Sequence, residues 1–282
     1  LLRQLPGSTE LSMKHEHVKR RPATPGGPSG ARGEDDTRGL VYGTHAAEAA
    51  LANPARRVRR VRATENAANR LAEAIAARGI EAERVSPRDL DRLLGADTVH
   101  QGVLLDVEPL AEPELATLIE RAVGGAPLVV LDHVTDPHNV GAVLRSAAVF
   151  GAAGLIMTRR HSPPINATLG KATSGALELV PVLAVQNLAK TLAELARQGL
   201  EIIGLDGEAE RVIDDEPFAR PVAIVLGAEG KGLRQLTRES CTRLCRIPAE
   251  PGALASLNVS NAAAVTLHLA AMRRRGRAAA AG

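Results

Sequence analysis

Residues 127–152 read PLVVLDHVTDPHNVGAVLRSAAVFGA. The apolar run at 128–131 has the composition of a buried strand, and the polar turn after it holds Asn139. A helix follows and carries Arg145 in its second turn. Core packing alone does not require Asn and Arg at these places. In α/β proteins, chemistry is usually located where a strand end leads into a helix N-terminus, so this stretch predicts both a fold class and a candidate site.

Short apolar runs alternate with helical segments from residue 128 onward. The expected strands are LVVL, GLIMT, LVPVLAV, LEIIGLD, VAIVLG and RLCRIP, and the expected helices begin near Val140, Ala167, Leu188, Leu233 and Asn258. This alternation predicts an α/β fold with a mostly parallel sheet that is covered on both faces. Three strand-end loops are polar and Gly-rich: DPHNVG, LGAEGKGL and IPAEPGALASLNVSNAAA. In a parallel sheet such loops converge into one crevice.

A smaller α/β unit precedes this region. The segment GLVYGTHAAEAALAN predicts a strand, a turn and an Ala-rich helix, and RVRRVRAT alternates with period two, which predicts a strand with Val58 facing inward. A helix in NAANRLAEAIAARG should place Leu71 and Ile75 on one face and stop at Gly79. The segments IEAERV, SPRDLDRLLG and QGVLLDV then predict a strand, a short helix and another strand.

Four segments follow from these patterns. Residues 1–38 are rich in Pro, Gly and charge without apolar periodicity, so we expect a disordered tail. The smaller unit covers 39–107, a linker with one short helix covers 108–126, and the larger unit covers 127–282.

Aromatic residues make up only 1% of the chain: Tyr42, Phe150 and Phe218. The core must therefore be built from Ala, Leu, Val and Ile. Proteins that read single-stranded nucleic acid usually stack bases on aromatic side chains, and this chain has very few. If the protein binds RNA, we expect charge, shape and backbone groups to contribute most of the binding.

Basic residues cluster although the formal net charge is only +3. Five of the seven residues at 56–62 are Arg, including Arg57, Arg59 and Arg60, and RRRGR stands at 273–277. Clustered Arg favours a polyanion, because guanidinium forks fit phosphate oxygens and binding releases counterions. Solvated surface arginines are the alternative. Two clusters far apart in the sequence favour RNA as the partner.

Several function classes are excluded or disfavoured. Cys241 and Cys245 make neither a disulfide framework nor a zinc site, and His133 and His138 lack a third ligand with useful spacing, so we expect no metal. The chain has neither a GxGxxG fingerprint after a strand nor a P-loop motif. We expect no membrane span, because no apolar run reaches about 18 residues. No secretory apolar segment is present either, so we expect a cytoplasmic protein.

The three polar loops carry a resemblance. NVGAVLRSA, IVLGAEGKGL and IP…SLNVSNAAA resemble the three motifs of the SpoU/TrmH group of SPOUT RNA 2′-O-ribose methyltransferases, and KATSGALELVPV fits as well. VYGTHAAEAAL…VHQGVLLDV is similar to the ribosomal-protein-L30e-like RNA-binding domain that precedes this enzyme core. The resemblance covers about residues 40–275. It implies a C-terminal trefoil-knotted domain, RNA rather than DNA as substrate, and a homodimer whose sites form at the subunit interface with the last helix taking part.

The resemblance also implies S-adenosylmethionine as the cofactor, held by the second and third motif loops. The matching positions are Leu205, Gly207, Leu226, Gly227, Ile247, Ser256 and Leu257. These positions are largely apolar or glycine, which suits an adenine ring and a sulfonium methyl group.

The catalytic positions implied by the resemblance are Arg145, Asn139, Glu229 and Asn258. Arg145 stays protonated, so we expect it to lower the pKa of the ribose hydroxyl electrostatically rather than to act as a general base. Asn139 and Asn258 have an alternative reading as helix caps, and Glu229 as a solvated loop carboxylate. Ser260 belongs to the third motif.

Lys171 and Ser174 either line the substrate face or lie on a solvated helix surface.

Among members of the family, the resemblance favours those that methylate a guanosine of 23S rRNA. One alternative is a tRNA 2′-O-methyltransferase. Another is a non-catalytic RNA-binding factor in ribosome assembly, which would not need to keep Asn139, Arg145, Glu229 and Asn258 together. A small-molecule methyltransferase is disfavoured by the basic clusters and the separate first unit.

Overall fold

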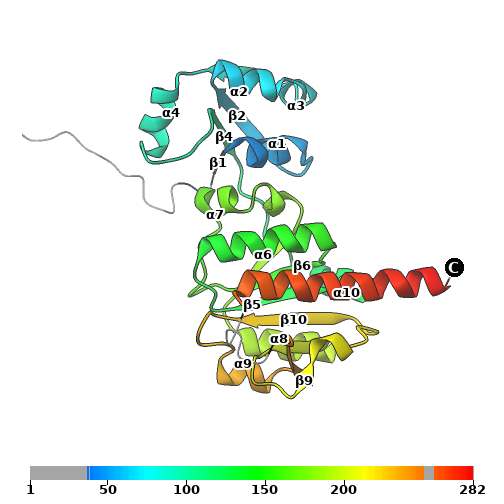
Figure 1. The fold of residues 1–282 in the computed structure, drawn as a ribbon. Coiled ribbons are helices and arrows are strands. Elements are labelled where there is room, and N and C mark those ends of the chain that lie inside the picture. Colours follow the sequence, from blue (N-terminus) through cyan, green and yellow to red (C-terminus); the bar gives the residue numbers. More distant parts are fainter. Residues whose placement is uncertain (1–36, 38, 251–256, 282) are drawn as a thin grey trace, which may run out of the picture. The chain divides into compact units, whose positions relative to one another are not determined.

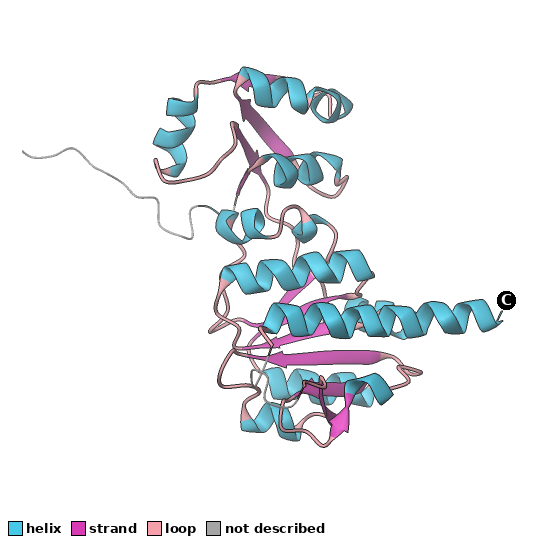
Figure 2. Ribbon diagram, in the orientation of Figure 1, coloured by secondary structure: helices cyan, strands magenta, loops and turns pink. Residues whose placement is uncertain are grey.

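The computed structural model describes residues 37, 39–250 and 257–281 (Figure 1), so nearly all of the predicted tail lies outside the described residues. The described chain forms two sheets, one with four strands and one with seven. Helices and strands alternate through both of them (Figure 2). This is the α/β organisation that the sequence predicts.

The four-stranded sheet belongs to the first unit. Its elements are β1 (Leu40–Tyr42), α1 (Thr44–Ala52), β2 (Val58–Ala63), α2 (Glu65–Arg70), α3 (Ala72–Ala77), β3 (Ala82–Arg84), α4 (Pro87–Leu94) and β4 (Val103–Val107). The strand order is β1-β4-β2-β3, with β4 antiparallel to both neighbours and β3 parallel to β2. The predicted strand–turn–helix at the start and the helix beginning at Pro87 are both present.

Small side chains build the core of this unit. Val61 and Ala63 of β2 and Leu105 of β4 are fully buried against α1, where Ala47 and Ala50 are also fully buried. Alanine lets the helix lie close to the sheet, which compensates for the lack of aromatic residues. Leu71, Ile75 and the partly buried Val58 join the same cluster, as the sequence pattern predicts.

The seven-stranded sheet belongs to the second unit. After α5 (Leu115–Val123), its elements are β5 (Leu128–Asp132), α6 (Pro137–Phe150), β6 (Gly154–Thr158), α7 (Ala167–Ala172), η2 (Ala176–Glu178), β7 (Val182–Val185), α8 (Leu188–Arg197), β8 (Glu201–Leu205), β9 (Arg211–Val212), η3 (Ile213–Asp215), β10 (Val222–Gly227), α9 (Gln235–Glu239), β11 (Arg243–Arg246) and α10 (Val259–Ala281). The strand order is β7-β6-β5-β10-β8-β11-β9, and every pairing is parallel. The sequence analysis missed the two-residue strand β9.

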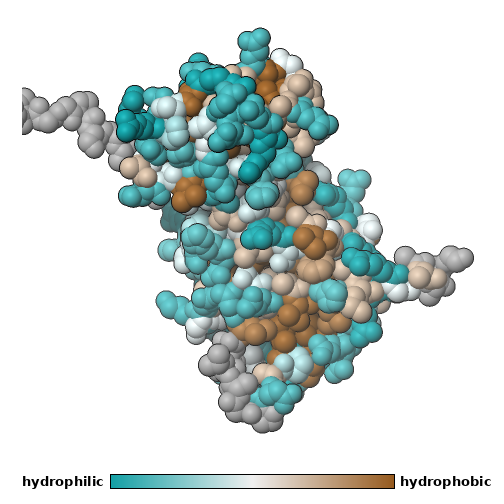
Figure 3. All heavy atoms as spheres, turned by 45° about the horizontal axis from the view of Figure 1, so that its top comes forward, coloured by the Kyte–Doolittle hydropathy of each residue, from teal (hydrophilic) through white to brown (hydrophobic). Residues whose placement is uncertain are grey.

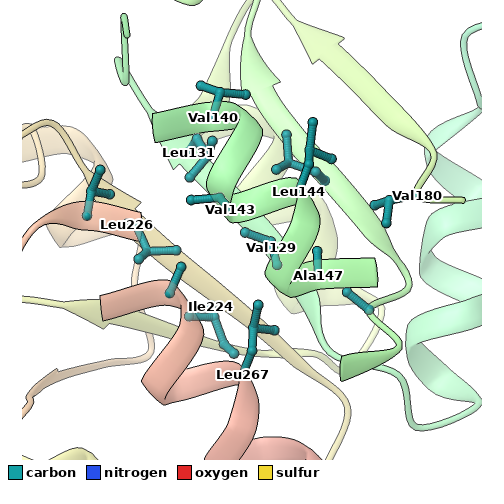
Figure 4. Packing of buried hydrophobic residues seen from close by; sticks show 14 of the residues in the cluster. Val129, Leu131, Val140, Val143, Leu144, Ala147, Val180, Ile224, Leu226 and Leu267 are labelled. Carbon is teal, nitrogen blue, oxygen red and sulfur yellow. The ribbon is translucent and has the colours of Figure 1, made fainter. Parts of the chain in front are cut away.

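Strand side chains alternate between two cores. Val129 and Leu131 of β5 pack with α6 and α10, whereas Leu128 and Val130 pack with α5 and α8 on the opposite face. Figure 4 shows the first of these cores, with Leu267 of α10 beside residues of β5, β10 and α6. Each fully buried Leu, Ile or Val side chain stabilises the fold by about 1.5–3 kcal/mol. Coverage of both faces explains why these strands are continuous apolar runs.

Helices α6 and α10 lie side by side and run in the same direction. At their starts Asn258 donates to Asn139, and near their ends the Arg274 guanidinium donates to the carbonyl of Phe150. The arginines of the 273–277 cluster therefore contribute to structure: Arg273 and Arg277 also donate to backbone carbonyls, those of Asp214 and Pro217. The trefoil knot stays a prediction.

Among the described residues, no helix combines the length and the apolar character that crossing a bilayer requires.

Candidate active site

The carboxyl ends of β5 and β10 lie next to each other, with Asp132 opposite Gly227 in the parallel register. Asp132 is 1% exposed. Its carboxylate accepts from Arg234 twice, from Nε at 2.7 Å and from the backbone N–H at 3.0 Å. This pair ties the chain after β10 to the end of β5. The sequence analysis did not single out either residue, although an acidic residue directly after LVVL was a usable signal.

The loop that follows β10 is tight. A Cβ atom on Gly227 would lie 2.1 Å from the carbonyl carbon of Gly232 and 2.4 Å from the backbone nitrogen of Leu233, which no side chain can tolerate. Ala228 and Gly232 form an isolated β-bridge, and Gly232 N–H donates to the Ala228 carbonyl at 2.8 Å. Gly227 is therefore required by backbone packing, and the loop presents Glu229 at its tip.

Glu229 is held by two asparagines. Its Oε1 accepts from Asn139 Nδ2 at 3.2 Å and, through a short contact, from Asn258 Nδ2. Asn258 Nδ2 also donates to Asn139 Oδ1 at 3.0 Å. The structure thus brings together three of the four predicted catalytic residues, from α6, the loop after β10 and the start of α10. Glu229 is exposed on its loop, as the reading of a solvated loop carboxylate expects, and the structure adds the two amide partners.

The two asparagines differ in their relation to the helices. Asn258 Oδ1 accepts from the Ser260 backbone N–H at 2.8 Å and from its hydroxyl at 2.6 Å, so Asn258 caps α10 and also holds Glu229. Asn139 does not cap α6. The cap is Asp136, whose carboxylate accepts from the His138 N–H at 2.9 Å. The cap reading is therefore wrong for Asn139 and correct for Asn258, where it coexists with the site contact.

Arg145 lies six residues beyond Asn139 on α6, and its side chain is exposed. It makes no hydrogen bond or ion pair with the residues that the structure describes. The structure does not join it to Glu229. Within the described ranges, no side chain or carbonyl occupies its guanidinium, which can therefore meet a bound group.

The predicted cofactor residues gather at the ends of three adjacent strands. Leu205 ends β8 and Gly207 follows it, and Leu226 and Gly227 end β10. Ile247 follows β11, in which Cys245 lies opposite Leu205 in the register. Leu257 is 50% exposed, and Ser256 lies outside the described residues. Leu226 is 2% exposed, so its side chain belongs to the core and only its backbone can face a ligand.

These residues suit the adenosyl part of S-adenosylmethionine. Leu205 and Ile247 are only partly buried against the core, which leaves apolar atoms available to a flat ring. Asp206, between Leu205 and Gly207, forms an ion pair with Arg238 of α9 and so fixes the loop beside them. An apolar wall with exposed backbone groups is the usual composition of a nucleoside pocket.

The predicted RNA-binding arginines lie on β2 and directly before it, and they stay accessible. The side chains of Arg57, Arg59 and Arg60 are 78%, 64% and 56% exposed. Arg57 and Arg59 share the carboxylate of Glu108, at 3.5 and 3.1 Å. Exposed pairs of this kind contribute about 0–1 kcal/mol, so a phosphate can replace the carboxylate at little cost.

Arg56, from the same cluster, has a different role. Its side chain is 4% exposed and pairs with Glu178 of η2, whose side chain is also 4% exposed, at 2.6 Å. Lys171 of α7 also reaches the first unit, where its Nζ donates to Gln101 Oε1 at 2.8 Å. Burial lowers the pKa of Lys171. These contacts join the two units, and a cavity of about 510 Å³ between them contains none of the predicted site residues.

The structure also describes the surroundings of the remaining candidates, which are a metal site, Ser174 and the two cysteines. Within the described ranges, no cluster of three or more His, Cys, Asp or Glu side chains is arranged to hold a metal ion. Ser174 is exposed with a φ of 50°. Burial raises the pKa of both Cys241 and Cys245 to about 12, which makes the thiols unreactive.

Comparison with known proteins agrees with this geometry. Residues 126–268 match the model of the SpoU rRNA Methylase family, and residues 40–113 match the model of the RNA 2′-O ribose methyltransferase substrate binding domain. A 23S rRNA (guanosine-2′-O-)-methyltransferase RlmB from Pseudomonas aeruginosa is 42% identical over 234 residues, which are 80% of this chain and 93% of that protein. The RlmB of Xylella fastidiosa (strain 9a5c) is 48% identical over 200 residues, 70% of this chain and 80% of that protein.

Solved structures show the same fold. The SpoU methyltransferase AviRb from Streptomyces viridochromogenes, in complex with the cofactor AdoMet, superimposes with a TM-score of 0.69 at 25% identity, covering 84% of this chain and 90% of that one. An RNA methyltransferase of the TrmH family from Porphyromonas gingivalis, described as putative, gives a TM-score of 0.68 at 26% identity, covering 83% and 89%. From these matches and the site geometry, the chain belongs to the SpoU rRNA methylase family.

Proposed function

We propose that this protein transfers a methyl group from S-adenosylmethionine to the ribose 2′-oxygen of a guanosine in 23S rRNA. The observation that carries the proposal is the network of Asn139, Glu229 and Asn258, which joins the start of α6, the loop after β10 and the start of α10. The named activity of the relatives from Pseudomonas aeruginosa and Xylella fastidiosa supports the choice of substrate.

The reaction makes a specific demand on the protein. When bound, S-adenosylmethionine would supply the methyl group on its positively charged sulfur: the carbon–sulfur bond would break as the bond to the ribose 2′-oxygen forms, S-adenosylhomocysteine would leave as a neutral thioether, and the hydroxyl proton would pass to solvent. A ribose hydroxyl is a very weak acid, so the protein must position it and stabilise its developing negative charge. Arg145 is the catalytic residue for this role, because its exposed guanidinium has no carboxylate partner within the described chain.

Glu229 is a positioning residue in this scheme. Two amide donors on one oxygen fix the orientation of its carboxylate. Its second oxygen, Oε2, takes no part in the contacts to Asn139 and Asn258, so it is available to a ribose hydroxyl or to an arginine. Because both amides belong to helix starts, the carboxylate is oriented before RNA binds, and no reorganisation is needed at the moment of reaction.

The active form is a homodimer in which α6 and α10 contribute to the interface. These helices expose Val149, Val265 and Met272, at 73%, 43% and 54%. Figure 3 shows apolar side chains gathered into a patch within a largely hydrophilic surface, the kind of surface that a second copy can cover. Arg145 lies on α6, one turn before Val149, so a dimer formed here would bring it near the partner subunit. Light scattering on the purified protein measures its molecular mass in solution, which distinguishes a homodimer from a monomer.

The first unit supplies affinity for RNA. Arg57, Arg59 and Arg60 form an exposed basic segment at the start of β2, and their pairing to carboxylates is weak. The target hydroxyl is absent from DNA, so selectivity for RNA is set at the reacting atom. Ribosomal RNA is made and assembled in the bacterial cytoplasm, and the protein acts there.

The test is transfer of labelled methyl groups from S-adenosylmethionine to rRNA and tRNA fractions from cells that lack this gene. We expect label in 23S rRNA with the wild-type protein and none with Arg145→Ala. Nuclease digestion then identifies the product as 2′-O-methylguanosine. Label in tRNA alone would keep the chemistry and overturn the substrate. If the protein bound RNA but neither bound the cofactor nor transferred methyl groups, the result would favour a non-catalytic RNA-binding factor in ribosome assembly.

A further inference from the structure

Two histidines stack on each other near the candidate active site. The rings of His133 and His161 have centroids 4.6 Å apart and planes inclined by 38°. His133 directly follows β5, and His161 lies three residues after β6, the strand next to β5. Neither the cofactor pocket nor the Glu229 network includes them.

The stack adjoins the crevice through Asp132. That residue precedes His133 in the chain, lies opposite Gly227 and binds Arg234. On the other side of His133, the turn continues into α6 and reaches Asn139 six residues later. The rings thus sit on the same strand-end edge as the site residues, one strand away from the Gly227 loop.

The backbone is unusual at both histidines. His133 has a φ of 58° and His161 a φ of 63°, the left-handed region that glycine adopts most easily. Five described residues other than glycine have positive φ, and two of them are this stacked pair. Strained conformations of this kind are concentrated at functional sites, where the fold holds a side chain in a required place.

The surroundings of His133 favour the neutral form of its ring. Burial lowers the pKa of His133, and Arg234 and His161 lower it further, while Asp132 opposes them. A neutral imidazole attracts a phosphate weakly, but it stacks on a flat ring. His133 is half-buried and His161 is exposed, so the outer ring is the one that a ligand can reach.

We infer that the His133–His161 stack is a platform for a base of the RNA next to the methylated ribose. This inference rests on the proposed function. Single-stranded RNA is usually read by stacking, and the three aromatic residues offer little for it. Phe218 is 2% exposed, Phe150 is half-buried against His268, and Tyr42 is half-buried against the core of the first unit. The imidazoles supply the flat surface that Phe, Tyr and Trp provide elsewhere.

Three variants test the platform. His161→Asn removes the outer ring with a residue that tolerates positive φ, and His161→Phe keeps a ring without ring nitrogens. His161→Lys supplies a positive charge without a ring. Gln198→Ala, at the exposed end of α8, is the matched control. For each variant we would measure the Kd for a 23S rRNA fragment, the KM and kcat of methyl transfer, the Kd for S-adenosylmethionine and the Tm.

We expect His161→Asn to raise the RNA Kd and KM about tenfold, the loss typical of one stacked base, with cofactor Kd and Tm unchanged. His161→Phe should restore most of this affinity and His161→Lys little. Unchanged RNA affinity in His161→Asn would overturn the inference, as would rescue by Lys but not Phe. Equal losses of cofactor affinity and Tm would assign the stack to packing. If wild-type protein transfers no methyl group while RNA affinity still depends on the ring, the proposed function fails and the platform stands.

Discussion

The buried pair of Arg56 and Glu178 permits a quantitative test of how the two units are joined. Glu178 Oε1 accepts from Arg56 Nη2 at 2.6 Å, and both its oxygens accept from Nε at 3.1 Å. Arg56 Nη1 donates to the Glu108 carbonyl at 2.9 Å, and Asn53 Nδ2 donates to Glu178 Oε2 at 2.8 Å. Both charged groups are therefore almost fully removed from water and depend on each other.

Removing one partner leaves the other charge buried without compensation. Glu178→Leu and Arg56→Met should each lower the free energy of unfolding by about 3–5 kcal/mol. For a chain of this size that corresponds to a fall in Tm of about 6–20 °C. The double variant Arg56→Met/Glu178→Leu removes both charges and leaves only the Glu108 carbonyl and the Asn53 amide without these partners, so it should lose only about 1–3 kcal/mol.

The measurement is a double-mutant cycle by urea unfolding, followed by far-ultraviolet circular dichroism because the chain has no Trp. We expect a coupling energy of about 3 kcal/mol or more. Limited proteolysis within residues 108–114 supplies a second readout, since loss of the pair should also expose this connection between the units.

Two results would refute the reasoning. If each single variant stayed within about 1 kcal/mol of wild type with unchanged proteolysis, the pair would behave like a hydrated surface pair. If the double variant lost the sum of the two single effects, Arg56 and Glu178 would contribute independently, and the ion pair would not be what joins the units.

Three further predictions concern the site and the thiols. Arg145→Lys keeps the charge but loses the planar fork, so kcat should fall about 10²-fold or more, nearly as far as in Arg145→Ala; near wild-type turnover in labelled-methyl assays would contradict this. Asn258→Asp keeps a cap for α10 but places a carboxylate against Glu229, so thermal melts should show a nearly unchanged Tm while methyl transfer falls about 10²-fold; equal loss in both would mean that Asn258 serves only the helix. Cys241 and Cys245, with pKa values of about 12, should resist iodoacetamide at pH 8 and react only in urea, which mass spectrometry checks; rapid labelling of native protein would show exposed thiolates.

Local sequence patterns were sufficient to predict those parts of the structure that depend on a short stretch of the chain. The apolar run before Asp132 is buried on both faces, and Gly227 ends a strand and turns too sharply for any Cβ. Both facts follow from short stretches whose composition permits few other conformations. The succession of strands and helices in the second unit could therefore be predicted, but the order of the strands in the sheet could not. The grouping of Asn139, Glu229 and Asn258 came from the family resemblance, and the hydrogen bonds among them are a finding of the structure.

Contacts between segments that are distant in the sequence could not be predicted from local patterns. Arg56 and Arg57 are adjacent and identical in type, yet Arg56 is buried and Arg57 is 78% exposed. The difference depends on Glu178, which lies 122 residues away in the chain. In the same way, Arg274 near the end of α10 donates to the last carbonyls of α6, and no feature of RRRGR distinguishes it from an RNA-binding arginine.

A helix cap and a site contact are usually treated as competing explanations for an asparagine, but Asn258 serves as both. Its Oδ1 is occupied by Ser260 at the start of α10, so the amide cannot rotate without breaking the cap, and its Nδ2 must point toward Asn139 and Glu229. The directions of α6 and α10 are in turn fixed by the core that Val143 and Leu144 share with Leu267. The orientation of the Glu229 carboxylate therefore derives from helix packing, and an apolar substitution in that core should affect methyl transfer without touching the site.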